Sequence, residues 1–166
     1  MADKICPCCA AQTVVTRGMS LCKYHRADVY KHIYTICLQE NSKAWKHGLT
    51  GDLTAEQFTV SAAYFVVVEG YNRTYACAYC GKKSAIGLDH WIPITQGGAS
   101  TFTNVIPCCF TCNVLKGNFT GDEFLDYMID TWKSPVAMAA RENIDCFWKL
   151  VNQGVNAVYE SYAGHY

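Results

Sequence analysis

The chain has 166 residues, of which 51% are hydrophobic and 17% are charged. This composition is typical of a folded globular protein and excludes a long disordered chain. No apolar run reaches the roughly 18 residues that a membrane-spanning helix requires, and the first residues contain no long apolar segment that would act as a signal peptide. We therefore expect a soluble intracellular protein.

The net charge is zero, with 14 basic and 14 acidic residues, which by itself argues against nucleic-acid binding. The charges are unevenly distributed, however. Residues 1–50 carry seven Lys or Arg against three Asp or Glu, and residues 71–120 carry four against one, whereas residues 51–70 and 121–166 are acidic. This pattern predicts a basic face opposite an acidic one, although ordinary solvated helix faces would produce the same distribution.

Eleven cysteines in an intracellular chain of this length indicate metal binding rather than disulfide bonds. In residues 1–27 a CxxC pair is followed, after twelve residues, by a cysteine and a histidine with the same spacing. This is the pattern of a zinc site with three cysteines and one histidine, and it predicts the ligands Cys6, Cys9, Cys22 and His25. Cys8 is a rival for either of the first two positions.

Helical patterns follow this N-terminal segment. Apolar residues at helical spacing predict a helix over residues 27–48, which Gly48 would end. Thr54 and Gln57 have the spacing of a capping box and predict the start of a helix over residues 55–69. The run "YFVVV" inside that range suits a strand equally well.

Two further CxxC pairs, separated by 28 residues, lie in the turn-rich segment 71–120. Each CxxC turn directs two thiolates toward one point, so the pairs predict a second zinc site with four cysteine ligands: Cys77, Cys80, Cys109 and Cys112. Cys108 lies next to one of these ligands but breaks the CxxC spacing, so we leave it out of the site.

Beyond the second zinc pattern, the sequence predicts two more helices. Thr120 and Glu123 form a capping-box pattern before "GDEFLDYMIDTW", and Ser134-Pro135 begins a long helical pattern that runs almost to the end of the chain. We therefore expect an N-terminal zinc knuckle (1–27), a helical connector (28–70), a central core (71–120) and C-terminal helices (121–166).

The polar residues between the second set of zinc ligands indicate chemistry. A zinc ion with four thiolates has no open position, so a reacting centre would have to be a separate site. Asp89 and Asn113 offer oxygen ligands for Mg²⁺ or Mn²⁺, and His90 offers a base that works near neutral pH. Neighbours on a strand point to opposite faces, so Asp89 and His90 share a task only if the chain bends there. Such a site is suited to phosphodiester hydrolysis.

The order of motifs in residues 75–120, which is CAYC, LDHWIP, Gly-Gly, Asn and then CxxCNxxKG, resembles the zinc-bearing HNH endonucleases, or ββα-metal nucleases. The resemblance implies that Asp89 binds a catalytic metal ion and that His90 is the general base. It further implies that Asn104 steadies the loop and orients the base, that Asn113 is the second metal ligand, and that Lys116 lies near phosphate.

The implied fold is of the α+β class, with a β-hairpin at about residues 86–109 followed by a short helix that carries Cys112, Asn113 and Lys116. The layout of the N-terminal knuckle is similar to small two-zinc HNH restriction enzymes and phage recombination or homing endonucleases. From this resemblance we expect Mg²⁺ or Mn²⁺ in catalysis, two structural Zn²⁺ and double-stranded DNA as partner. We also expect no organic cofactor and no membrane partner. Lys82 and Lys83 are candidates for contact with the DNA backbone, although exposed lysines in such a turn are as often merely solvated.

The same resemblance implies that the protein acts in the cytoplasm of a bacterium or a phage-infected cell. The apolar C-terminal helices are available to form a homodimer. Two alternatives remain open. One is a nuclease directed at RNA or at a nucleic-acid structure. The other is a zinc-stabilised nucleic-acid-binding or adaptor protein without catalysis, although such a protein has no use for Asp89 and His90 together.

Overall fold

The computed structural model describes the backbone of residues 23–69, 72–83 and 87–163, and the side chains of 31–67, 75–83 and 87–162. The predicted N-terminal zinc ligands Cys6, Cys9 and Cys22, and the side chain of His25, lie outside these described residues. The described chain combines helices with two short antiparallel hairpins, so the fold is of the α+β class.

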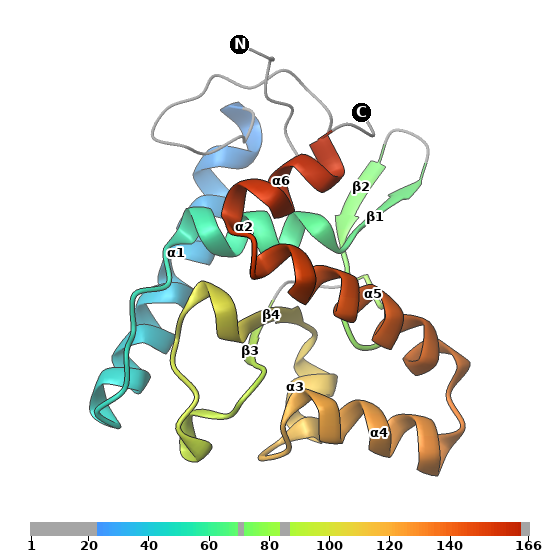
Figure 1. Ribbon diagram of the computed structural model, residues 1–166. Coiled ribbons are helices and arrows are strands. Elements are labelled where there is room, and N and C mark those ends of the chain that lie inside the picture. Colours follow the sequence, from blue (N-terminus) through green and yellow to red (C-terminus); the bar gives the residue numbers. More distant parts are fainter. Residues whose placement is uncertain (1–22, 70–71, 84–86, 164–166) are drawn as a thin grey trace.

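Six α-helices and four strands make up the regular structure of the described residues (Figure 1). The helices are α1 (Lys23–Lys46), α2 (Ala55–Tyr64), α3 (Phe110–Lys116), α4 (Gly121–Trp132), α5 (Pro135–Val151) and α6 (Val155–Ala163). The strands are β1 (Val66–Glu69), β2 (Asn72–Tyr75), β3 (Gly87–His90) and β4 (Val105–Cys108), and two short 3-10 helices, η1 (Ile94–Gln96) and η2 (Phe102–Asn104), lie between β3 and β4.

Local sequence signals account for several helix ends. Gly48 follows α1 with φ of 71°, a left-handed conformation that favours glycine. Thr54 and Thr120 both form the predicted capping boxes, with Gln57 and Glu123 as their respective partners. Ser134 caps α5, whose first residue is a proline, as the sequence predicted.

Two helix predictions were wrong in extent. The helix predicted over residues 55–69 ends at Tyr64, and Val66–Glu69 instead forms β1, which pairs with β2. The strand alternative is the correct one, because three consecutive valines favour an extended chain when a partner strand is present. The long C-terminal helix is interrupted between Val151 and Val155, where Gly154 has φ of 110°.

The β3–β4 hairpin lies in the middle of the molecule, with α2 on one side and α3 and α4 on the other (Figure 1). Gly87 pairs with Cys108 and His90 pairs with Val105, so the hairpin spans almost the range that the sequence predicted. The helix α3 begins two residues after β4 and completes a strand–loop–strand–helix unit. This unit brings the end of β3 next to α3.

One buried apolar cluster runs through the described residues from α1 to α6 and includes the cysteines around the hairpin. Phe58, Phe124 and Phe147 have no exposed surface, and each comes from a different helix. The flanking helices and the hairpin unit thus share a core, which fixes where each helix lies around the end of β3. None of the described helices combines the length and the apolar character needed to cross a membrane.

Candidate functional site

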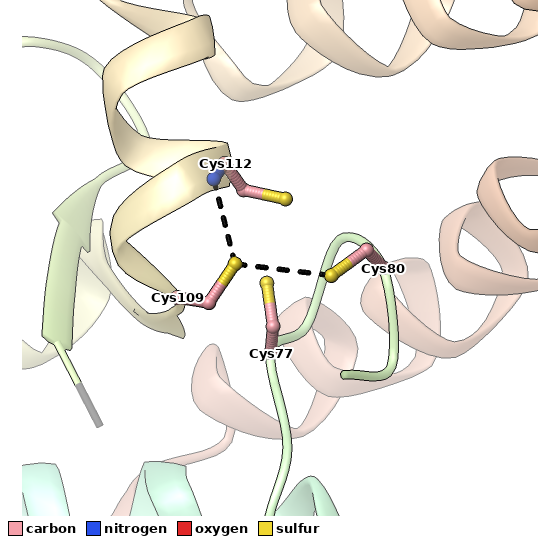
Figure 2. Close-up of side chains that lie close together, drawn as sticks. All are labelled: Cys77, Cys80, Cys109 and Cys112. Carbon is pink, nitrogen blue, oxygen red and sulfur yellow. Dashed lines mark hydrogen bonds between the residues drawn. The ribbon is translucent and has the colours of Figure 1, made fainter. Parts of the chain in front are cut away.

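Four cysteine thiols converge beside the hairpin, as the sequence predicted. The sulfur atoms of Cys77, Cys80, Cys109 and Cys112 all lie within 4.8 Å of one another, and the sulfurs of Cys80 and Cys109 are 3.8 Å apart (Figure 2). A tetrahedral zinc ion with bonds of about 2.3 Å separates its sulfur ligands by roughly 3.8 Å. The cluster therefore fits a zinc ion. Cys108 is not a member of it.

Two turns assemble this cluster. The first follows β2 and is closed by a hydrogen bond from the Gly81 amide to the Cys77 carbonyl, 2.8 Å long. In the second, Cys109 caps the N-terminus of α3 and its sulfur accepts from the Cys112 amide at 3.4 Å. The Ala78 amide donates to the Pro107 carbonyl at 3.0 Å, so the first turn is tied directly to β4. The cluster thus fastens α3 to the hairpin.

Asp89, His90 and Asn113 line one cavity of about 240 Å³ at the end of β3. His90 is the last residue of the strand, and the chain bends at residues 91–92. The bend follows both residues, which pair in regular register with β4, so it turns the chain after His90 without changing how Asp89 and His90 lie on the strand. Asn113 reaches the cavity from α3, so the cavity brings together the two predicted metal ligands and the predicted base.

The Asp89 carboxylate is buried and hydrogen-bonded on both oxygens. Its exposed fraction is 5%. The Tyr79 hydroxyl donates to Oδ2 at 2.7 Å, and the Lys116 ammonium lies 3.2 Å from Oδ1. Desolvation still outweighs these two favourable partners, so the pKa of Asp89 is raised above its ordinary value.

His90 is held as a neutral imidazole. Burial, with smaller contributions from the positive charges of Lys116 and Lys43, lowers its pKa from 6.5 to about 4. Its Nε2 atom is buried and has no hydrogen-bond partner among the described residues. A buried ring nitrogen without a partner is costly in a purely structural role, whereas a neutral imidazole beside a cavity suits proton transfer.

Asn113 is anchored through its nitrogen. Its Nδ2 donates to the Leu88 carbonyl at 3.0 Å, and no hydrogen bond between described residues uses Oδ1. The oxygen therefore remains available as a ligand. Together with the second lone pairs of Asp89, it makes a set of hard oxygen donors that suits Mg²⁺ or Mn²⁺ and leaves the rest of the shell to water and phosphate.

Asn104 is not among the residues that line the cavity. Its side chain accepts from the Ile92 amide at 2.9 Å and donates to the carbonyls of Ile92 and Ala99 at 3.0 and 2.9 Å. A Cβ at Gly98 would overlap the Ile92 carbonyl oxygen, so glycine is needed where this loop folds back. Asn104 thus holds the loop that follows His90, which is the steadying role implied by the resemblance.

The setting of Lys116 differs from the one expected. Its side chain is only 1% exposed, and its ammonium donates to the His90 carbonyl at 2.9 Å in addition to its ion pair with Asp89. Lys116 lines the cavity and its ammonium neutralises the candidate metal ligand Asp89, so its contact with a DNA phosphate stays a prediction. Lys82 and Lys83, by contrast, are exposed on the turn between the first two zinc ligands and β3.

Sequence reasoning missed three residues of the site. Glu40 and Lys43 of α1 line the cavity and form an ion pair of 2.6 Å. They lie more than 40 residues before His90 in the chain, and no local pattern links them to the motif. The sequence pattern did not point to Tyr79, because the two residues between the cysteines of a CxxC turn are not metal ligands.

A larger cavity, of about 520 Å³, lies between the β1 segment and α5. Its lining is mainly apolar, from residues such as Val66, Val136 and Ala140, and the described residues that line it include no carboxylate, imidazole or basic side chain. The smaller cavity at the end of β3 is therefore the better candidate for chemistry, because only that one combines oxygen ligands with a base.

The comparisons with known proteins agree with this location. Residues 77–119 match the family model described as HNH endonuclease. No curated protein matches the chain. The matched range contains the four clustered cysteines and Asp89, His90, Asn104 and Asn113, whereas Glu40 and Lys43 lie outside it. An HNH domain indicates a nuclease that acts on nucleic acids. Residues 77–119 of this chain, about a quarter of its length, are therefore similar to the HNH endonuclease domain.

Proposed function

We propose that this protein is a metal-dependent endonuclease that hydrolyses phosphodiester bonds in double-stranded DNA. The observation that carries the proposal is one cavity lined by a carboxylate, a neutral imidazole and a carboxamide, from Asp89, His90 and Asn113. Oxygen ligands for a hard cation beside a neutral base form the apparatus that metal-assisted phosphodiester hydrolysis requires.

Each residue has a distinct role in this proposal. Asp89 and Asn113 hold one Mg²⁺ or Mn²⁺, which when bound stabilises the charge that develops on the phosphate. His90 accepts a proton from the attacking water, and its low pKa keeps it neutral and ready to do so near pH 7. Asn104 acts indirectly, through the loop after His90. The zinc site is structural, because four thiolates leave no open position.

The charges near the cavity support a polyanionic substrate. Lys43 lines the cavity with a side chain that is 60% exposed, and Lys82 and Lys83 are exposed on the zinc turn. The acidic residues of segment 121–166 belong to α4, α5 and α6, away from these cations in the chain. Lys43 is paired with Glu40, which also lines the cavity, so the positive charge that supports a DNA phosphate contact is that of the exposed Lys82 and Lys83 on the zinc turn.

Further parts of the proposal concern the rest of the chain. A second structural zinc bound by Cys6, Cys9, Cys22 and His25 would form a module that docks DNA or a partner subunit. One active site cuts one strand, so a double-strand break requires a homodimer or two successive cuts. Eleven cysteines, nine of them in predicted zinc-binding patterns or beside them, support action in a reducing cytoplasm.

Nicking of a supercoiled plasmid in the presence of Mg²⁺ tests the proposal. The variant His90→Ala is expected to lose about 10²–10⁴-fold in rate, the usual contribution of a general base. His47→Ala is the matched control, since His47 is exposed at the end of α1 and does not line the cavity. The control should nick like the wild type, and chelation of Mg²⁺ should abolish nicking by both.

The same assay separates the rival functions. If the protein cleaves RNA or branched DNA faster than duplex DNA, then its substrate is that nucleic acid and not duplex DNA. If the wild type and His90→Ala are equally inert while both still bind DNA in a mobility-shift assay, the protein is a non-catalytic binding or adaptor protein.

A further inference from the structure

The Asp89 carboxylate has a fixed hydrogen-bond partner on each oxygen. The Tyr79 hydroxyl is 2.7 Å from Oδ2 and the Lys116 ammonium is 3.2 Å from Oδ1. A carboxylate oxygen has two lone pairs, so each oxygen keeps one for a further ligand. The two partners therefore set the rotation of the carboxylate without using all of its acceptor sites.

Tyr79 itself has little freedom to move. It lies between the cluster cysteines Cys77 and Cys80 and has no exposed surface. Its ring stacks on Trp91, with centroids 6.2 Å apart and an interplanar angle of 8°, and meets the edge of Phe124 at 5.2 Å. The ring is packed on these two sides, and the residue is held in a turn between two cluster cysteines. Its hydroxyl therefore cannot follow the carboxylate if the carboxylate rotates.

We propose that Tyr79 is a positioning residue that couples the four-cysteine site to the metal ligand Asp89. A zinc ion held by the four clustered cysteines would close the turn that fixes the Tyr79 ring, and the Tyr79 hydroxyl holds the Asp89 carboxylate in the orientation that faces the cavity. The inference rests on the proposed function, in which Asp89 binds a divalent metal ion. Hydrogen-bond partners of metal ligands typically account for about 10–100-fold in metal affinity or activity.

The variant Tyr79→Phe tests this coupling, because it keeps the ring and its packing and removes only the hydroxyl. Mn²⁺ binding is measured by electron paramagnetic resonance on the full-length, zinc-loaded chain without substrate. We expect the Kd for Mn²⁺ to rise about 10–100-fold while the zinc content stays unchanged. Tyr64→Phe is the matched control, since the Tyr64 hydroxyl makes only an exposed 3.4 Å contact with the Asn143 carbonyl.

A second measurement separates positioning from mere support of the fold. In the nicking assay, Tyr79→Phe should need a higher Mg²⁺ concentration for half-maximal rate and recover toward the wild-type rate at saturating Mg²⁺. A purely structural residue would lower the melting temperature and leave the Mn²⁺ Kd unchanged.

The outcomes distinguish this inference from the proposed function. If the wild type binds Mn²⁺ and nicks DNA, and Tyr79→Phe binds Mn²⁺ equally well, only the role of Tyr79 is overturned. If the wild type neither binds Mn²⁺ nor nicks DNA, the proposed function falls and the role of Tyr79 falls with it.

Discussion

The substitution Lys116→Met removes one charge from a buried ion pair and leaves Asp89 without its cation. The two side chains are exposed by only 1% and 6%, and the nitrogen and oxygen are 3.2 Å apart. Methionine keeps most of the length and the apolar stem of lysine, so the change isolates the ammonium group. The hydrogen bond from this ammonium to the His90 carbonyl is lost as well.

The expected cost is large relative to the stability of a protein of this size. Removing one partner of a buried ion pair destabilises by about 3–5 kcal/mol, because the remaining charge stays buried without compensation. Folded proteins are stable by about 5–15 kcal/mol in total. At about 2–4 °C per kcal/mol for chains of about 150–250 residues, the melting temperature should fall by roughly 6–20 °C.

The cost depends on pH, and its sign follows from the pKa of Asp89. Desolvation already raises this pKa in the wild type, and Lys116 opposes the shift. Without Lys116 the pKa rises further, so the folded variant binds a proton more tightly than the unfolded chain does. Lowering the pH toward the folded-state pKa therefore favours the folded variant, and its deficit should be smaller at acidic pH than at neutral pH.

Thermal melts followed by circular dichroism at neutral and at acidic pH measure both effects. Lys149→Met is the matched control, because Lys149 is exposed on α5 and a surface change of this kind shifts stability by less than about 0.5 kcal/mol. The reasoning is refuted if Lys116→Met melts as the control does, or if its deficit grows on acidification.

Three other predictions follow from the site. Because the pKa of His90 is about 4 and the neutral form is the base, the nicking rate should not fall between pH 7 and pH 6; a tenfold fall in a pH–rate profile would contradict this. Asn104→Ala should destabilise the protein by about 1–3 kcal/mol in denaturant melts, since it leaves the Ile92 amide without its acceptor; an unchanged midpoint would remove its role in the loop. Elemental analysis should find two zinc ions per wild-type chain and one in Cys6→Ser; one in both would refute the N-terminal zinc site.

Local chemistry made much of this fold predictable. A capping box needs only a threonine and a partner three residues on, and a CxxC turn needs only its own four residues to direct two thiolates together. The structure therefore confirms the capping boxes predicted at Thr54 and Thr120 and the predicted convergence of the two cysteine pairs. The errors arose where a partner strand decides the conformation, as at Val66–Glu69, which becomes a strand by pairing with β2.

Side-chain settings across the site were harder to predict, because they depend on contacts between distant segments. Lys116 has the sequence position expected for a phosphate contact, but α3 packs against β3 and places its ammonium on Asp89 and on the His90 carbonyl. Tyr79 reaches the same carboxylate from the zinc turn. Nothing in the spacing of these residues distinguishes a buried partner from an exposed one.

The sequence by itself determined the ligands of the four-cysteine cluster and the order of Asp89, His90 and Asn113, because turn and strand geometry fix such spacings within a few residues. Tertiary packing alone brings Glu40 and Lys43 of α1 to the cavity and buries the Lys116 side chain against Asp89 in the cavity lining. These placements come from the packing of helices around a shared core. Such packing depends on contacts between residues far apart in the chain, which local sequence patterns do not reveal.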